Sequence, residues 1–177
     1  MQLFLKHLFS KTSSKKNFIW VLAFFIITAI YMLYFMVNIF AIFPTVLDLE
    51  NFGYSTAKVI ETFTKYGSVG MYNYKQLQIG DIVFPISVFL FSGSILYKIF
   101  KESNSWIYFI PLFYMVFDYL ENFLLWSFRE SFPHIKENLV YLASTFSILK
   151  HSFIALMFVF STIKIVSNLF YSKKNNP

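Results

Sequence analysis

The chain has 177 residues, of which 57% are hydrophobic and 23% aromatic, and its mean hydropathy is +0.58. A soluble domain of this length does not carry so much apolar surface, so the composition indicates an integral membrane protein. The net charge of +6 comes mostly from lysines near the ends of apolar segments, which indicates membrane topology and excludes a nucleic-acid-binding surface. The absence of cysteine excludes disulfides, thiolate nucleophiles and cysteine metal sites.

Four apolar segments are each near or above the ~20 residues that a helix needs to cross the hydrocarbon of a bilayer. In chain order they are 18–43, 81–100, 106–128 and 139–166. Pro44 ends the first of them. The sequence therefore predicts an all-α fold, in which residues 1–177 form a single domain built as a four-helix transmembrane bundle.

The connection 44–79 is the one sizeable segment between the predicted spans. Ser55 is a good N-cap residue and Gly67 a good residue to end a helix. Apolar residues between them recur at helical spacing, which predicts a short amphipathic helix at the outer interface. Such a helix is either a lid over a pocket or a cover for the ends of the first two spans.

The lysines near the ends of the spans predict the topology. They precede the first span, flank the turn between the second and third, and follow the fourth: Lys6, Lys11, Lys15, Lys16, Lys98, Lys101, Lys173 and Lys174. The charges of the other two connections balance. The positive-inside rule then places both termini in the cytoplasm of a multi-pass protein of the cell (inner or plasma) membrane.

Lys150 lies near the middle of the fourth span, and Asp118 and Glu121 lie within the third. An ammonium at that depth costs roughly 2.5–3.5 kcal/mol on insertion scales. At ~1.5 Å per residue, Asp118 and Lys150 lie about 15 and 16 Å from the outer ends of antiparallel neighbouring helices. We therefore expect the ammonium of Lys150 to pair with one of the two carboxylates.

Further polar residues share the helix faces of these charges. Asn122 and Tyr114 lie on the stripe of Asp118, Ser147 and His151 lie near Lys150, and Asp81 enters at the outer end of the second span, where we expect it to be solvated. These residues predict a ligand-binding pocket that opens outwards, beneath the connection 44–79. The predicted ligand-binding residues are Asp81, Tyr114, Asn122, Ser147 and His151.

The stripe supplies more carboxylates than one ammonium can neutralise. Two acids close together in a dry bundle cannot both ionise beside a single cation, so one is protonated, shares a proton or faces a cationic ligand. Asp118 matches Lys150 in depth and is the expected structural partner. Glu121 is then the expected active group, with Asp118 and Lys150 completing the catalytic set.

Motifs for zinc hydrolases, nucleotide hydrolases and serine hydrolases are absent, and no metal or cofactor is predicted. The leading function is binding of a small amphiphilic or lipid-like molecule in the pocket, with acid–base chemistry as an extension. An oligomeric transporter or channel with a buried acid–lysine relay is the second function, since four helices of one chain rarely enclose a pore. The third is a non-catalytic subunit whose buried charges direct assembly with a partner protein. A buried ion pair that only fixes helix register accounts for the same residues without a ligand.

The topology can be tested by cysteine labelling, because the native chain has no cysteine. A single cysteine placed in the helix predicted within 56–66 is expected to react with an impermeant maleimide in intact cells. A cysteine placed near Lys173 is expected to react only after the membrane is opened. The opposite labelling pattern would place the termini outside and the pocket on the cytoplasmic side.

Overall fold

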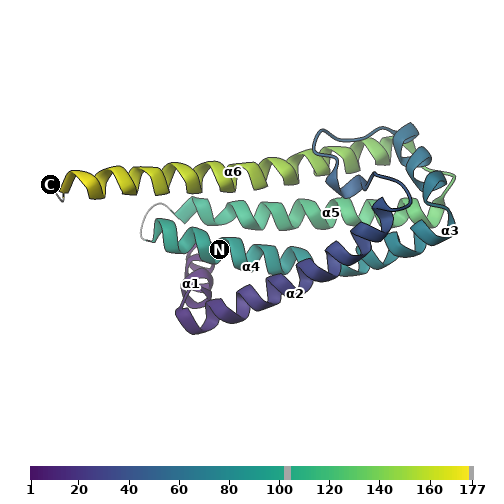
Figure 1. Ribbon diagram of the computed structural model, residues 1–177. Coiled ribbons are helices and arrows are strands. Elements are labelled where there is room, and N and C mark those ends of the chain that lie inside the picture. Colours follow the sequence, from purple (N-terminus) through teal and green to yellow (C-terminus); the bar gives the residue numbers. More distant parts are fainter. Residues whose placement is uncertain (102–104, 176–177) are drawn as a thin grey trace.

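The computed structural model describes residues 1–101 and 105–175 as an all-helical chain, and no strand occurs in this part (Figure 1). The α-helices are α1 (Gln2–Thr12), α2 (Lys15–Phe40), α3 (Thr56–Gly80), α4 (Phe84–Phe100), α5 (Phe109–Ser131) and α6 (Glu137–Asn175). Two short 3-10 helices, η1 (Leu47–Leu49) and η2 (Ser105–Tyr108), lie between them. The all-α prediction is confirmed.

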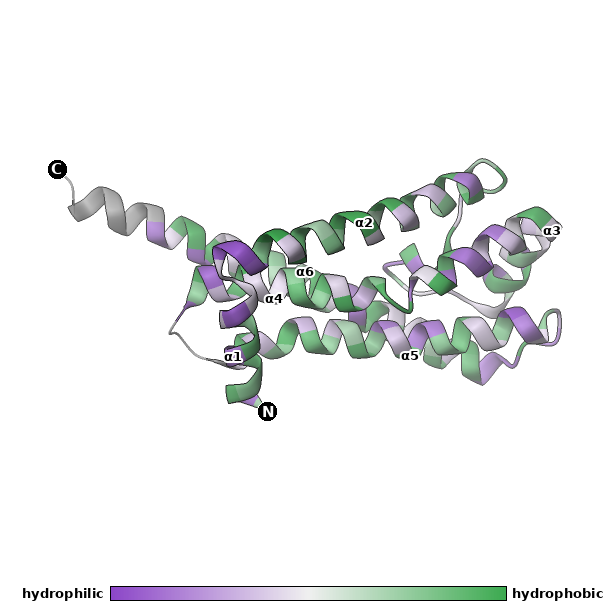
Figure 2. Ribbon diagram, turned by 90° about the horizontal axis from the view of Figure 1, so that it is seen from below, coloured by the Kyte–Doolittle hydropathy of each residue, from purple (hydrophilic) through white to green (hydrophobic). Residues whose placement is uncertain are grey.

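Three helices are long and apolar enough to cross a membrane: Lys15–Phe40, Trp106–Ser131 and Glu137–Asn168. They agree with the first, third and fourth predicted spans. Figure 2 shows that α2 is hydrophobic along most of its length, whereas α3 also carries hydrophilic residues. These helices indicate a multi-pass membrane protein, and the four-helix bundle stays a prediction.

The second predicted span, 81–100, differs most from the structure. The helix in this region, α4, begins only at Phe84 and has 17 residues, which span about 26 Å at 1.5 Å per residue. That is slightly short of the ~30 Å hydrocarbon thickness. Together α3 and α4 are long and apolar enough to form one broken span, with a bend of 44° between the two helices. The described part of the chain therefore has three candidate spans, or four if the bent pair of α3 and α4 forms a further span.

A second helical stretch follows the predicted cap helix within α3. Ser55 is the N-cap as predicted, and its side chain accepts a hydrogen bond of 3.3 Å from the Lys58 amide. Gly67 ends the first helical stretch of α3, as predicted. It breaks α3 with φ of 55° and ψ of −162°, and helical structure then continues to Gly80. The continuation is stabilised by packing, because Tyr74 and Leu77 beyond the break are buried.

The N-terminal helix α1 was not predicted. It runs across the direction of the longer helices (Figure 1). Leu5 and Phe9 on its inner face are buried, whereas Leu3 and Phe4 are exposed. Phe9 contacts the rings of Phe89 and Tyr108, at centroid distances of 5.1 and 5.9 Å. These contacts hold α1 against α4 and η2, at one end of the molecule.

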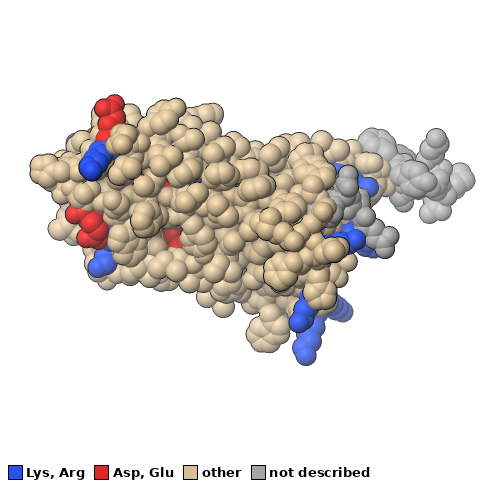
Figure 3. All heavy atoms as spheres, turned by 180° about the vertical axis from the view of Figure 1, so that it is seen from behind, with Lys and Arg blue, Asp and Glu red and all other residues tan. Residues whose placement is uncertain are grey.

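The packing of α1 depends on a glycine in α4. A β-carbon added at Gly93 would overlap the ring of Phe9, so the missing side chain makes the close approach possible. Thr12 also accepts a hydrogen bond of 2.6 Å from Ser94 of α4. Lysine side chains gather at this end of the molecule, on the face shown in Figure 3. The opposite end carries both acidic and basic side chains.

We expect Gly93→Ala to destabilise the fold by about 1–3 kcal/mol through overpacking against Phe9. Phe9→Leu in the same chain should recover part of that loss, because it shortens the side chain that the new methyl group overlaps. Thermal unfolding in detergent measures both effects. Ser92→Ala, one residue away on α4, is the matched control. Additive losses in the double mutant would show that the Gly93–Phe9 contact does not position α1.

Candidate functional site

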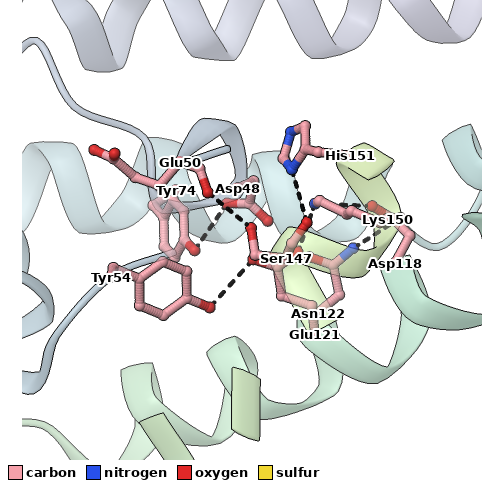
Figure 4. Close-up of polar contacts among 10 residues, drawn as sticks. All are labelled: Asp48, Glu50, Tyr54, Tyr74, Asp118, Glu121, Asn122, Ser147, Lys150 and His151. Atoms are coloured by element: carbon pink, nitrogen blue, oxygen red, sulfur yellow. Dashed lines mark hydrogen bonds and ion pairs between the residues drawn. The ribbon is translucent and has the colours of Figure 1, made fainter. Parts of the chain in front are cut away.

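The Lys150 ammonium contacts both acids of α5. Its Nζ lies 3.0 Å from Asp118 Oδ1 and 2.7 Å from Glu121 Oε2, and the side chains of all three residues are buried (Figure 4). The pairing expected from helix depth is therefore present in the structure. The three side chains form one ion-pair cluster, in which Glu121 is as close to Lys150 as Asp118 is. The depth of the residues along their helices predicts only Asp118 as the partner of Lys150.

Each acid has a further hydrogen-bond donor. Asn122 Nδ2 donates to Asp118 Oδ2 at 3.1 Å, which is the interaction expected between residues four apart on one helix. The Tyr54 hydroxyl donates to Glu121 Oε1 at 3.1 Å. The cluster is therefore tied to α5, to α6 and to the segment that precedes α3.

The segment 41–55 between α2 and α3 folds back into the helices. Its backbone is held on α6, because the Tyr54 amide donates to Ser144 Oγ at 2.9 Å and Ser147 Oγ donates to the Glu50 carbonyl at 3.2 Å. On the other side, the Tyr66 hydroxyl of α3 donates to the Thr45 carbonyl at 2.5 Å. This segment is thus an ordered part of the site.

Asp48 is carried into the interior by this segment and is 9% exposed. The Tyr74 hydroxyl donates to its Oδ2 at 3.0 Å, whereas Oδ1 has no hydrogen-bond partner in the described part of the chain. Burial raises the pKa of the Asp48 carboxyl above its usual range, and the positive charge of Lys150 offsets this effect only in part. The expectation that the charges of the connection 44–79 balance one another outside the bundle is wrong for Asp48, because Asp48 is buried beside Lys150.

Asp81 is also buried. It is 6% exposed, and within residues 1–101 and 105–175 its Oδ2 has no hydrogen-bond partner. The expectation that Asp81 is solvated at the end of a span is wrong, because Asp81, at the break between α3 and α4, is buried and lines an internal wall. The interior thus holds four carboxylates, Asp48, Asp81, Asp118 and Glu121.

A cavity of about 420 Å³ lies beside these acids. Asp48, Asp81, Asp118, Lys150 and His151 line it together with Tyr114. The rest of its wall is apolar and comes from several helices: Ala29, Met32, Leu33, Met36, Val46, Leu49, Leu77, Phe84 and Ile154. A volume in this range and an apolar wall with a few converging polar groups are typical of small-molecule sites.

The structure brings most of the predicted site residues together. Asp81, Asp118, Tyr114, Lys150 and His151 line the cavity. Glu121, Asn122 and Ser147 lie behind this wall, where they contact Lys150, Asp118 and the Glu50 carbonyl, respectively. His151 Nδ1 bonds the Ser147 carbonyl at 2.8 Å. The lining favours Asp118 over Glu121 as the group that meets a ligand.

Sequence reasoning missed Asp48, Tyr54 and Tyr74. Asp48 lies between Leu47 and Leu49, and Leu47 is fully buried. An acid flanked by leucines in a connection between spans is a weak signal of burial, and it was available in the sequence. The two tyrosines carried no such signal, since the chain has twelve.

The described part of the chain contains no group of three or more histidine, cysteine or acidic residues arranged to hold a metal ion. Comparison with known proteins found no matching family model, no matching curated protein and no matching solved structure.

Lys150→Met is expected to destabilise the protein by about 3–5 kcal/mol, because it leaves buried acids without their cation. Adding Asp118→Asn or Glu121→Gln should recover part of the loss, and adding both should recover more than either one. Thermal unfolding in detergent measures the series. If no combination is more stable than Lys150→Met, the ion pairs do not support the fold.

Proposed function

We propose that this protein binds a small amphiphilic or lipid-like molecule within the membrane, in the cavity beside the carboxylate–lysine cluster. The observation that carries the proposal is the make-up of the cavity wall. It is apolar over most of its surface and has charged groups, Asp48, Asp81, Asp118 and Lys150, on part of it. A molecule with an apolar chain and a polar head matches such a wall, because the chain replaces lipid contacts and the head contacts the charges.

The size of the cavity supports a small ligand. A cavity of about 420 Å³ lies in the lower part of the range of about 300–1,000 Å³ that small-molecule sites have. A single-chain amphiphile, or one chain of a larger lipid, is therefore the class of ligand that we propose.

Acid–base chemistry on the bound molecule is the extension that we propose of this binding function. Asp118 lines the cavity while its Oδ1 contacts the Lys150 ammonium, so a proton can pass between this carboxyl and a bound molecule. In this role Asp118 is the catalytic candidate, and Lys150 and Glu121 are positioning residues. The alternative functions, an oligomeric transporter or channel and a subunit of a larger complex, both require an assembly of several chains. The cavity, by contrast, is lined by residues of a single chain.

Blocking the cavity tests the proposed function. Ala29→Trp adds a large side chain at a residue that lines the cavity. Ile30→Trp adds the same side chain one residue away, where Ile30 is 62% exposed, and is the matched control. Native mass spectrometry of the purified protein is carried out with decylamine, decanol and decanoate in equal amounts.

The wild type and Ile30→Trp are expected to hold one molecule of at least one of the three compounds, and Ala29→Trp to hold none. The measurement reads binding and not stability, so thermal unfolding of each variant is recorded beside it. Equal adducts on Ala29→Trp and the wild type, or no adduct on the wild type, would contradict the proposed function.

A further inference from the structure

Two carboxylate oxygens in the cavity wall have no hydrogen-bond partner among the residues that the structure describes. They are Asp48 Oδ1 and Asp81 Oδ2, and each belongs to a residue that is more than nine-tenths buried and lines the cavity. Buried carboxylate oxygens are seldom left without a donor, because the loss of hydration is large unless a hydrogen bond or a cation replaces it. These two oxygens therefore indicate which chemical group completes the site.

Lys150 does not satisfy them. Its ammonium forms its ion pairs with Asp118 and Glu121, at 3.0 and 2.7 Å. Arg129, further along α5, bonds Gln78 and Glu130. In the part of the chain that the structure describes, no salt bridge involves Asp48 or Asp81. The site thus carries an excess of acid over base, and the excess lies on the cavity wall.

The donor that fits this excess is a cation with several N–H groups. An ammonium has up to three donors and a positive charge, so it can bond two carboxylates at once. A hydroxyl has a single donor and no charge. A carboxylate head group has no donor when ionised and would be repelled by the acids in the wall. The head group that complements the cavity is therefore an amine.

The walls also indicate where the chain of such a ligand lies. One side of the cavity is formed by Ala29, Leu33 and Met36 of α2, and the other includes His151 and Ile154 of α6. α2 packs on α3 and α4, whereas α6 packs chiefly on α5. Leu33, on the α2 side, is 56% exposed. The cavity thus lies between two helices that do not close upon each other, on a surface that faces lipid if α2 spans the membrane.

We propose that the cavity takes an aliphatic amine, whose ammonium is held between Asp48 and Asp81 and whose chain lies between α2 and α6, where it enters from the bilayer. This inference rests on the proposed function and names the ligand class of the same site. A long-chain amine and the amino head group of a membrane lipid share this chemistry, as does a small soluble amine without a chain.

The test measures head-group selectivity on wild-type protein in detergent by native mass spectrometry. Decylamine, decanol and decanoate share one chain and differ in head group, whereas butylamine keeps the amine and shortens the chain. Decylamine is expected to bind at least about tenfold more tightly than decanol, since hydrogen bonds to charged groups are stronger than neutral ones. Butylamine and decanoate are expected to bind more weakly still.

Asp81→Asn and Asp48→Asn are each expected to lower the affinity for decylamine about tenfold or more. The affinity for decanol is expected to change by less than about threefold. Glu130→Gln is the matched control, because it removes an acid whose side chain is 65% exposed at the end of α5. It should change neither affinity. If the aspartate variants do not fold, the selectivity of the wild type still decides the proposal.

The outcomes separate this inference from the proposed function. Equal binding of decanol and decylamine, or a preference for decanoate, would overturn the proposal that the ligand is an amine. The proposed function, binding of an amphiphile in this cavity, would still stand. Butylamine binding as tightly as decylamine overturns the role of the chain and points to a soluble amine. If none of the compounds binds, both proposals fail.

Discussion

The burial of one ammonium among acids is the constraint on which the rest of this structure depends. Lys150 lies between Asp118 and Glu121, and removing a single partner from such a group leaves an unpaired charge in a dry interior. α5 and α6 must therefore keep their register, and this helix pair makes the most extensive packing contact in the described fold. The other elements of the site are arranged around this pair. The segment 41–55 bonds α6 through Ser144 and Ser147, and brings Tyr54 to Glu121.

A device that only fixed register would need one carboxylate for its ammonium. This interior has four, and the two that Lys150 does not contact line a cavity with an oxygen each left unbonded. The hydrogen bond from Tyr74 covers one oxygen of Asp48, so the arrangement is only partly satisfied by the protein itself. Such a partly satisfied polar network in an apolar surrounding is unfavourable on its own. A ligand cation that completes it accounts for both the acids and the space.

The sequence was sufficient for the parts of this fold that depend on composition and helical period. Hydropathy located α2, α5 and α6, and depth along antiparallel helices was enough to place Asp118 and Glu121 beside Lys150. Asp48 and Asp81 could not be placed in this way. Their burial depends on the path of the 41–55 segment and on the bend between α3 and α4, which are set by tertiary contacts such as the bond from Tyr66 to Thr45. Helix α1 was missed for the same reason, since its position depends on the fit of Phe9 to Gly93.

The central claim is that the carboxylate–lysine cluster is the polar end of a ligand cavity. An experimental density map of the protein purified in native lipid, at a resolution that shows single acyl chains, tests it most directly. The account predicts elongated density between α2 and α6, with its polar end within hydrogen-bonding distance of Asp48 and Asp81. Side chains of α2 packed directly on Lys150, with no space between them, would contradict it. So would a water-filled path along a symmetry axis between copies of the chain.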